Sequence, residues 1–180
     1  MKNRFKVLMI VSILALTLST AAHAGGKAGD LPPDNSSAEL NRIKSLAGRW
    51  TTVTSMFGKK NQRMFTEYKV TAGGSAVEER IFPGTPQEMI SVYYDDNGKL
   101  AMTHYCIMRN RPTLKLANSS ADMITMDVKK IEGLTSKKDP SMGGLTIHFK
   151  DKNHFQTTCK AKGKGKENEA PMTTEWTRLR

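Results

Sequence analysis

The chain has 180 residues, of which 38% are hydrophobic, and its formal net charge is +11. That length is enough for one domain with a sizeable hydrophobic core. Only two cysteines are present, Cys106 and Cys159, which excludes a disulfide-dense scaffold and leaves the core to stabilise the fold.

The first 24 residues have the three-part pattern of a secretory signal peptide. Lys2, Arg4 and Lys6 make the start positively charged. Residues 7–18 are almost wholly apolar, and residues 22–24 (Ala-His-Ala) fit the small-residue cleavage rule. The apolar run is short for a bilayer span, and an uncleaved membrane anchor is the alternative. We therefore predict cleavage at the end of this segment and a mature protein that is periplasmic or secreted.

The next residues predict a leader and then one short helix. Residues 25–35 are rich in glycine, proline and aspartate and predict a flexible leader. From Ser36 to Ala47 the apolar residues recur at helical spacing. Ser36 is placed as the N-cap with Glu39 as its capping-box partner, and Gly48 ends the helix. The main domain is expected to span residues 36–180.

After this helix the apolar residues recur every second position, which is typical of half-buried β-strands. Asn97-Gly98 is the strongest turn motif, because both central positions of a tight hairpin favour positive φ. A polar loop is expected over residues 130–143. The ten predicted strands span residues 49–57, 63–71, 75–82, 88–95, 99–108, 113–118, 123–129, 145–150, 154–162 and 171–179.

These strands are joined mostly by short turns, so strands adjacent in sequence should pair antiparallel. Ten such strands rarely stay in one flat sheet, and closure removes the exposed edges. We therefore predict an all-β fold, an up-and-down antiparallel β-barrel of about ten strands with a short N-terminal helix. A two-sheet sandwich is the alternative.

The start of the first strand carries a recognisable motif. Gly48-Arg49-Trp50 follows the helix directly, and this Gly-x-Trp arrangement resembles that of the lipocalin and related calycin barrels. In that family the tryptophan lies at the closed end of the barrel, and a basic residue of the last strand packs across it. The resemblance implies a structural role for Trp50, and we expect its basic partner to be Arg178.

The central segments resemble an uncharacterised family of small bacterial exported proteins with a lipocalin-like barrel. The resemblance rests on residues 71–79, 82–93 and 102–106, and it covers residues 45–118 well and the rest loosely. It implies a fold and no activity. Relatives usually have Gly-Asn-x-Pro after a His-Tyr-Cys motif, whereas this chain has Arg109-Asn110-Arg111-Pro112.

His104 is the leading candidate for chemistry. It shares one face of its strand with Leu100, Met102 and Cys106, so it should point into the barrel. A neutral imidazole there could donate to or accept from a ligand, or bind haem iron, or be satisfied by a neighbouring Glu or Tyr. Haem is disfavoured, because residues 51–54 lack the glycine-rich opening that haem-binding relatives have after the Gly-x-Trp.

Other candidates are weaker. Glu78 and Glu79 lie on opposite faces of one strand, so at most one points inward. Methionines on the strands could line a flexible cavity or simply fill the core. No paired carboxylates, nucleophile motif, phosphate-binding loop or metal-ligand spacing occurs, so we predict no catalytic residue, metal or cofactor.

Cys106 and Cys159 are expected to remain free thiols. Export permits a disulfide, but the meander sets their strands several strands apart, and Cα atoms more than about 7 Å apart cannot be bridged without backbone movement.

Three functional interpretations follow. The leading one is an exported barrel that binds a small apolar or amphipathic molecule in its cavity. The second is a non-catalytic envelope or protein-interaction module with a filled barrel and a basic surface. The third is a small hydrolase or isomerase with His104 as base. The expected ligand-binding residues are His104, Tyr68, Tyr93, Glu79 and Met102.

The net positive charge of the chain gives only weak information about its binding partners. Removal of the signal peptide leaves a net charge of about +8, which permits weak contact with anionic surfaces. The basic residues are spread along the chain, so no specific nucleic-acid binding is expected. The sequence leaves the oligomeric state open.

Overall fold

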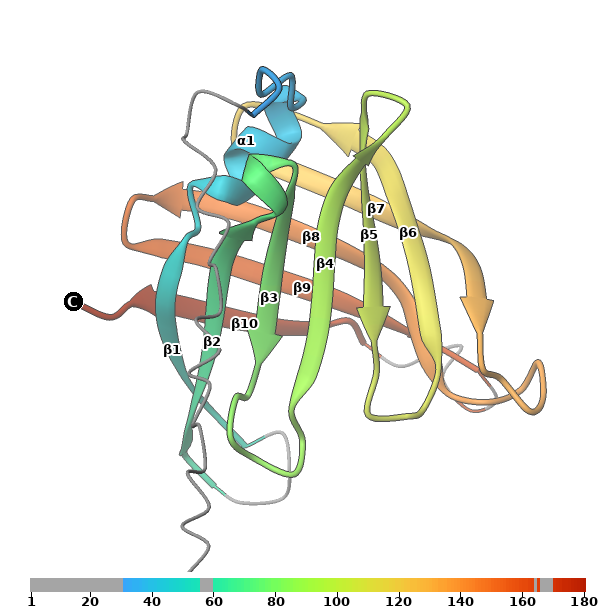
Figure 1. The fold of residues 1–180 in the computed structure, drawn as a ribbon. Helices are drawn as coiled ribbons and strands as arrows, with labels where there is room; N and C mark the ends of the chain where they lie inside the picture. Colours follow the sequence, from blue (N-terminus) through green and yellow to red (C-terminus); the bar gives the residue numbers. More distant parts are fainter. Residues whose placement is uncertain (1–30, 56–59, 164, 166–169) are drawn as a thin grey trace, which may run out of the picture. The chain divides into compact units, whose positions relative to one another are not determined.

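Ten antiparallel β-strands close into a barrel, preceded by one short helix (Figure 1). The computed structural model describes residues 31–55, 60–163, 165 and 170–180. The predicted signal peptide and its cleavage site lie outside the described residues, as does most of the predicted leader. The unit described below is Pro33–Arg180.

Each strand pairs with its neighbours in sequence, and β1 pairs with β10 to close the barrel. The up-and-down barrel is therefore confirmed, and the sandwich alternative is wrong. The elements are α1 (Ala38–Lys44), β1 (Gly48–Thr54), β2 (Gln62–Thr71), the 3-10 turn η2 (Ala72–Gly74), β3 (Ala76–Ile81), β4 (Met89–Asp96), β5 (Lys99–Tyr105), β6 (Arg111–Ser119), β7 (Met123–Glu132), β8 (Ser141–Asp151), β9 (His154–Lys162) and β10 (Met172–Arg178).

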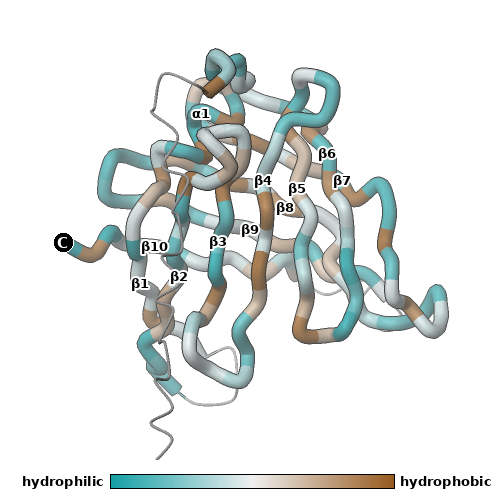
Figure 2. The backbone as a smooth tube through the Cα atoms, in the orientation of Figure 1, coloured by the Kyte–Doolittle hydropathy of each residue, from teal (hydrophilic) through white to brown (hydrophobic). Residues whose placement is uncertain are grey.

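Buried and less buried residues alternate along much of β2 and β5, and hydrophobic and hydrophilic positions interchange along the strands in Figure 2. Successive side chains of a strand point to opposite faces, so one set fills the barrel and the other meets solvent. The largest fully buried side chains are Trp50, Tyr68, Tyr93, Phe155, Leu40, Ile43, Leu100, Met102, Leu114, Ile124, Met126 and Ile147.

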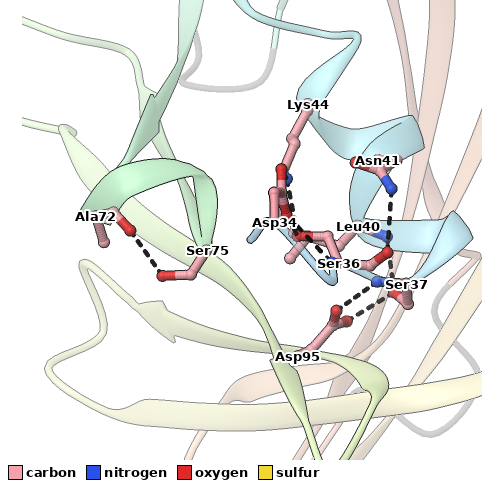
Figure 3. Close-up of polar contacts among 9 residues, drawn as sticks. All are labelled: Asp34, Ser36, Ser37, Leu40, Asn41, Lys44, Ala72, Ser75 and Asp95. Atoms are coloured by element: carbon pink, nitrogen blue, oxygen red, sulfur yellow. Dashed lines mark hydrogen bonds and ion pairs between the residues drawn. The ribbon is translucent and has the colours of Figure 1, made fainter. Parts of the chain in front are cut away.

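Helix α1 covers one end of the barrel (Figure 1). Its N-cap is Ser37 and not the predicted Ser36: the Ser37 hydroxyl accepts from the Leu40 amide at 3.1 Å. The Asp95 carboxylate of β4 accepts from the amide and the hydroxyl of Ser37, at 2.6 and 2.7 Å (Figure 3). This tertiary contact makes Ser37 the N-cap residue, while the Ser36 hydroxyl donates to Asp34 instead. The helix is shorter than predicted because its last turn tightens.

Two predicted connections differ from the structure. The expected loop of residues 130–143 shrinks to residues 133–140, since β7 runs to Glu132 and β8 begins at Ser141. The sequence at these strand ends has no regular alternation of apolar and polar residues, yet the backbones pair with β6 and β9. Strand β5 ends at Tyr105 and not at 108, because the Arg109 amide bonds back to the Cys106 carbonyl at 2.9 Å.

The two ends of the barrel differ in character (Figure 1). Helix α1, η2 and the β4–β5 turn lie at one end, and the β3–β4, β5–β6 and β7–β8 loops lie at the other. We refer to these as the helix end and the loop end. Within the described part of the chain, no helix is long and apolar enough to cross a membrane.

Candidate functional site: a cavity at the loop end

A cavity of about 320 Å³ extends into the barrel from the loop end. Its walls are mainly apolar, and five methionines contribute to them. Three of its lining residues, Ile107, Met108 and Met172, are also 43–51% exposed, so the cavity reaches the surface. The methionines are Met89, Met102, Met108, Met142 and Met172.

The methionines of the strands divide between the two roles that the sequence left open. Met64 and Met126 are buried in the core, whereas Met89 and Met102 line the cavity. A thioether side chain has several rotatable bonds and a polarisable sulfur, so it adapts to ligands of irregular shape. The methionines therefore give the cavity a wall that can adapt to the shape of a ligand.

Polar groups gather in one row at the inner part of the cavity. The register of β2 to β5 places Tyr68 opposite Glu79, Glu79 opposite Ser91, and Ser91 opposite His104. All four side chains are buried and lie on the inner face. Tyr93 follows Ser91 by two positions on β4 and therefore shares that face.

Hydroxyl groups converge on the Glu79 carboxylate. It accepts from the Tyr68 hydroxyl at 2.6 Å and from the Tyr93 hydroxyl at 3.0 Å. The Thr66 hydroxyl lies 3.3 Å from the same carboxylate and 3.0 Å from the Arg80 carbonyl. Burial raises the pKa of Glu79, and these hydrogen bonds oppose that rise. The carboxyl group is thus fully partnered although it has little contact with water.

The two tyrosines act as donors across the physiological range. Burial, followed by the neighbouring Glu79 charge, raises the pKa of both Tyr68 and Tyr93 well above the ordinary value. Their phenols keep their protons and hold the carboxylate in place. Tyr68 does not line the cavity but lies behind Glu79, so its placement differs from that expected of a ligand-contacting residue.

His104 lies inside the barrel, as the alternation along its strand predicted. Its Nδ1 is 3.0 Å from the Ser91 hydroxyl. Burial lowers its pKa from 6.5 to about 4, so the ring is neutral at neutral pH. A neutral imidazole can make hydrogen bonds to a ligand, but burial works against the imidazolium that a general base must become.

The expected site residues separate into two groups. His104, Glu79, Tyr93 and Met102 line the cavity, while Tyr68 supports Glu79 from behind. Sequence reasoning missed Ser91, which lies opposite both Glu79 and His104 in the strand register and is hydrogen-bonded to His104. Its position two residues before Tyr93 indicates the shared face, but only the strand register shows what it meets.

Trp50 and Arg178 form a separate structure away from the cavity. The indole of Trp50 donates to the Leu46 carbonyl at 2.7 Å, and the Arg178 guanidinium carbon lies 4.1 Å from the indole ring centre. The predicted contact is confirmed. Arg178 also donates to the backbone carbonyls of Ala47, Lys152 and Ser45 at 2.7, 2.8 and 3.0 Å.

The two cysteines are free thiols, half-buried, and both line the cavity. Burial, with a smaller contribution from Cys106, raises the pKa of Cys159 to about 11. The Cys159 thiol therefore stays protonated and behaves as a small apolar wall group. Among the described residues, no group of three or more His, Cys, Asp or Glu side chains could hold a metal ion.

Arg109 lies in the turn between β5 and β6. Its φ is 59°, in the left-handed region that glycine adopts without strain. Its side chain lines a polar depression beside the cavity, where Arg111 pairs with Glu132 at 2.7 Å.

These features define a closed antiparallel β-barrel with an apolar cavity that opens at one end. Neither a protein-family model nor a curated protein sequence matches the chain. The resemblance to exported lipocalin-like proteins stays a prediction.

Proposed function

We propose that the protein is an exported, non-catalytic binding protein that holds a small apolar or amphipathic molecule inside its barrel. The cavity of about 320 Å³ carries this proposal. Ligand pockets are concave and mainly apolar, with a few placed polar groups that orient the ligand. Here His104, Glu79 and Tyr93 supply those groups within walls made largely of methionine.

The size of the cavity favours binding over a filled interaction module. Packed protein interiors contain few voids larger than a water molecule, so a filled barrel would leave no space of this volume. The neutral state of His104 at neutral pH likewise favours a hydrogen-bonding role over a catalytic one. Contact with anionic surfaces through the basic residues stays a weaker prediction.

Export is supported by residues 1–24 alone. The mature N-terminus tests it: protein recovered from the periplasm or the medium of its own host should begin at Gly25. Recovery of the full-length chain from the inner membrane would contradict cleavage. Native mass spectrometry of the same preparation should show a co-purifying small molecule.

Filling the cavity provides the test of binding. Met142→Trp places a bulky indole ring in the cavity wall. Met123→Trp is the matched control, because it places the same ring at an exposed position outside the cavity. Nile red fluorescence should rise on binding to the unaltered protein and to Met123→Trp. The apparent affinity for the dye should be at least tenfold lower in Met142→Trp. Equal dye binding by both variants would show that the cavity is not the site.

A further inference from the structure

Two apolar side chains occupy the tip of the β5–β6 loop. The Arg109 amide donates to the Cys106 carbonyl at 2.9 Å, and the Cys106 amide donates to the Asn110 carbonyl at 3.1 Å. Ile107 and Met108 are therefore the central residues of a tight turn, where glycine, proline, asparagine, aspartate and serine predominate. Both side chains are exposed, so burial in the core does not explain their apolar character.

These two residues belong to an apolar rim around the opening of the cavity. Ile107 and Met108 line the cavity from the β5–β6 loop, and Met172 lines it from the start of β10. All three side chains are exposed, and we call them the mouth residues. Single apolar side chains on a surface are ordinary, whereas a group of them around one opening indicates an interaction site.

Positively charged side chains without acidic partners lie at the same end of the barrel. Arg109 follows the apolar pair in the turn, and Lys160 lines the cavity. Lys137 and Lys138 lie in the β7–β8 loop. All four are exposed, and their side chains form no ion pair or hydrogen bond among the described residues. Their charge therefore remains available to a partner.

The acidic side chains of the same region already have partners within the protein. Glu132 forms ion pairs with Arg111 and Lys130 at 2.7 and 2.6 Å. Asp139 accepts from two backbone amides of its own loop at 2.7 and 2.9 Å. The loop end therefore presents unpaired positive charge to solvent beside the mouth residues.

We propose that the loop end docks on the surface of an anionic lipid bilayer, with the mouth residues inserted between headgroups and the cations above them. Apolar and basic side chains on one face are typical of proteins that bind at the membrane interface, and anionic lipids attract basic residues near that surface. A bilayer fits this face better than a folded protein does, because a fluid surface adapts to an apolar rim around an opening. This inference goes beyond ligand binding, since it assigns a partner to the surface around the cavity.

Vesicle flotation of the mature protein, which lacks the apolar residues 7–18, tests the apolar part of the proposal. The unaltered protein should bind vesicles that contain phosphatidylglycerol and phosphatidylcholine, but not vesicles of phosphatidylcholine alone. Ile107→Ser combined with Met108→Ser should lower the partition coefficient about tenfold. Met123→Ser is the matched control, because it removes an exposed methionine beside helix α1, and it should leave binding unchanged.

A second pair of variants tests the contribution of charge. Arg109→Gln should weaken binding to the anionic vesicles about fivefold, the effect of one basic residue near a charged surface. Arg180→Gln removes the same charge at the C-terminus, away from the β5–β6 loop (Figure 1), and should leave binding unchanged. Binding to the anionic vesicles should also weaken as salt screens the charges. Equal losses in the two variants would overturn docking through this face.

Hydrogen exchange of the unaltered protein gives a measurement that no substitution can disturb. With anionic vesicles, the amides of residues 106–110 should exchange more slowly, and those of Asn97 and Gly98 in the β4–β5 turn should not change. Slower exchange at the β4–β5 turn alone, equal binding to both kinds of vesicle, or no binding to either would overturn the proposal. The last result would leave a protein as the partner of this face.

Nile red binding in the absence of vesicles separates this proposal from the proposed function. A protein that binds the dye but no vesicles would keep its function as a binding protein and lose the membrane surface. A protein that binds anionic vesicles but no dye would keep the docking face, and the cavity would lose its assignment as a binding site.

Discussion

At the scale of single residues, burial drives the ionisable groups of the cavity toward their neutral forms. It raises the pKa of Glu79 and lowers that of His104, because an apolar environment disfavours charge of either sign. The hydroxyls of Tyr68 and Tyr93 donate to Glu79, and the Ser91 hydroxyl is hydrogen-bonded to His104, so hydrogen bonds compensate for part of the burial. The site is therefore polar enough to orient a ligand, and its histidine is neutral at neutral pH.

This arrangement makes stability depend on pH through His104. The ordinary pKa of the ring is 6.5 and its pKa in the folded protein is about 4. Between these values the unfolded chain binds a proton that the folded protein does not, so stability falls as pH decreases through this window. The loss should reach on the order of 3 kcal/mol near pH 4.

Urea unfolding at about pH 7 and about pH 4.5 measures this contribution. The fall in unfolding free energy should be smaller in His104→Gln than in the unaltered protein. Met102→Leu, which alters the same cavity wall without a titrating group, should leave the fall unchanged. An equal fall in His104→Gln would show that the ring is protonated in the folded state.

At the scale of elements, helix α1 depends on the barrel for its stability. Its seven residues are too few to persist alone in water. Leu40, Ile43 and Leu46 pack into the core, and Asp95 of β4 holds the N-cap Ser37. The helix closes its end of the barrel because the barrel supplies both contacts.

We expect Asp95→Ala to lower stability by about 2 kcal/mol, since it removes a charged acceptor from a partly buried N-cap. The neighbouring Asp96→Ala removes an exposed ion pair with Lys115 and should cost under about 1 kcal/mol. Denaturant unfolding compares the two variants. Hydrogen exchange should in addition show faster exchange of the α1 amides in Asp95→Ala only. Similar losses in both variants would mean that the cap contributes nothing beyond a surface charge.

At the scale of the whole molecule, barrel closure depends on a short seam. Strands β1 and β10 share only two paired positions, Trp50 with Arg178 and Thr51 with Thr177. Arg178 strengthens the seam by donating to three backbone carbonyls from two other segments, while its guanidinium covers Trp50. One side chain thereby joins the last strand, the helix end and the β8–β9 turn.

Arg178→Lys tests this closure while keeping the charge. A lysine cannot reproduce the planar fork that reaches several carbonyls at once, so we expect a loss of about 1–3 kcal/mol in unfolding free energy. Arg180→Lys, at the exposed chain end, should change stability by less than about 0.5 kcal/mol. Hydrogen exchange in β1 and β10 should increase in Arg178→Lys alone. An unchanged stability in both variants would show that closure does not need the fork.

Much of the fold can be predicted from the sequence, because the patterns that indicate strands and turns lie within short segments of the chain. The alternation of Leu100, Met102 and His104 identifies the inner face of β5, and Asn97-Gly98 predicts the hairpin that both residues form with positive φ. Trp50 beside Arg178 follows from closure, since the first strand of an up-and-down barrel meets the last.

The chemistry of the cavity was decided only by the tertiary structure. Alternation places Glu79, Ser91 and His104 on inner faces, but the register between strands sets them opposite one another. The same holds for Ser37, which is the N-cap because Asp95 reaches it across the fold. A periodic pattern is a property of one strand, whereas a hydrogen bond between strands depends on the turns and bulges that set their offset.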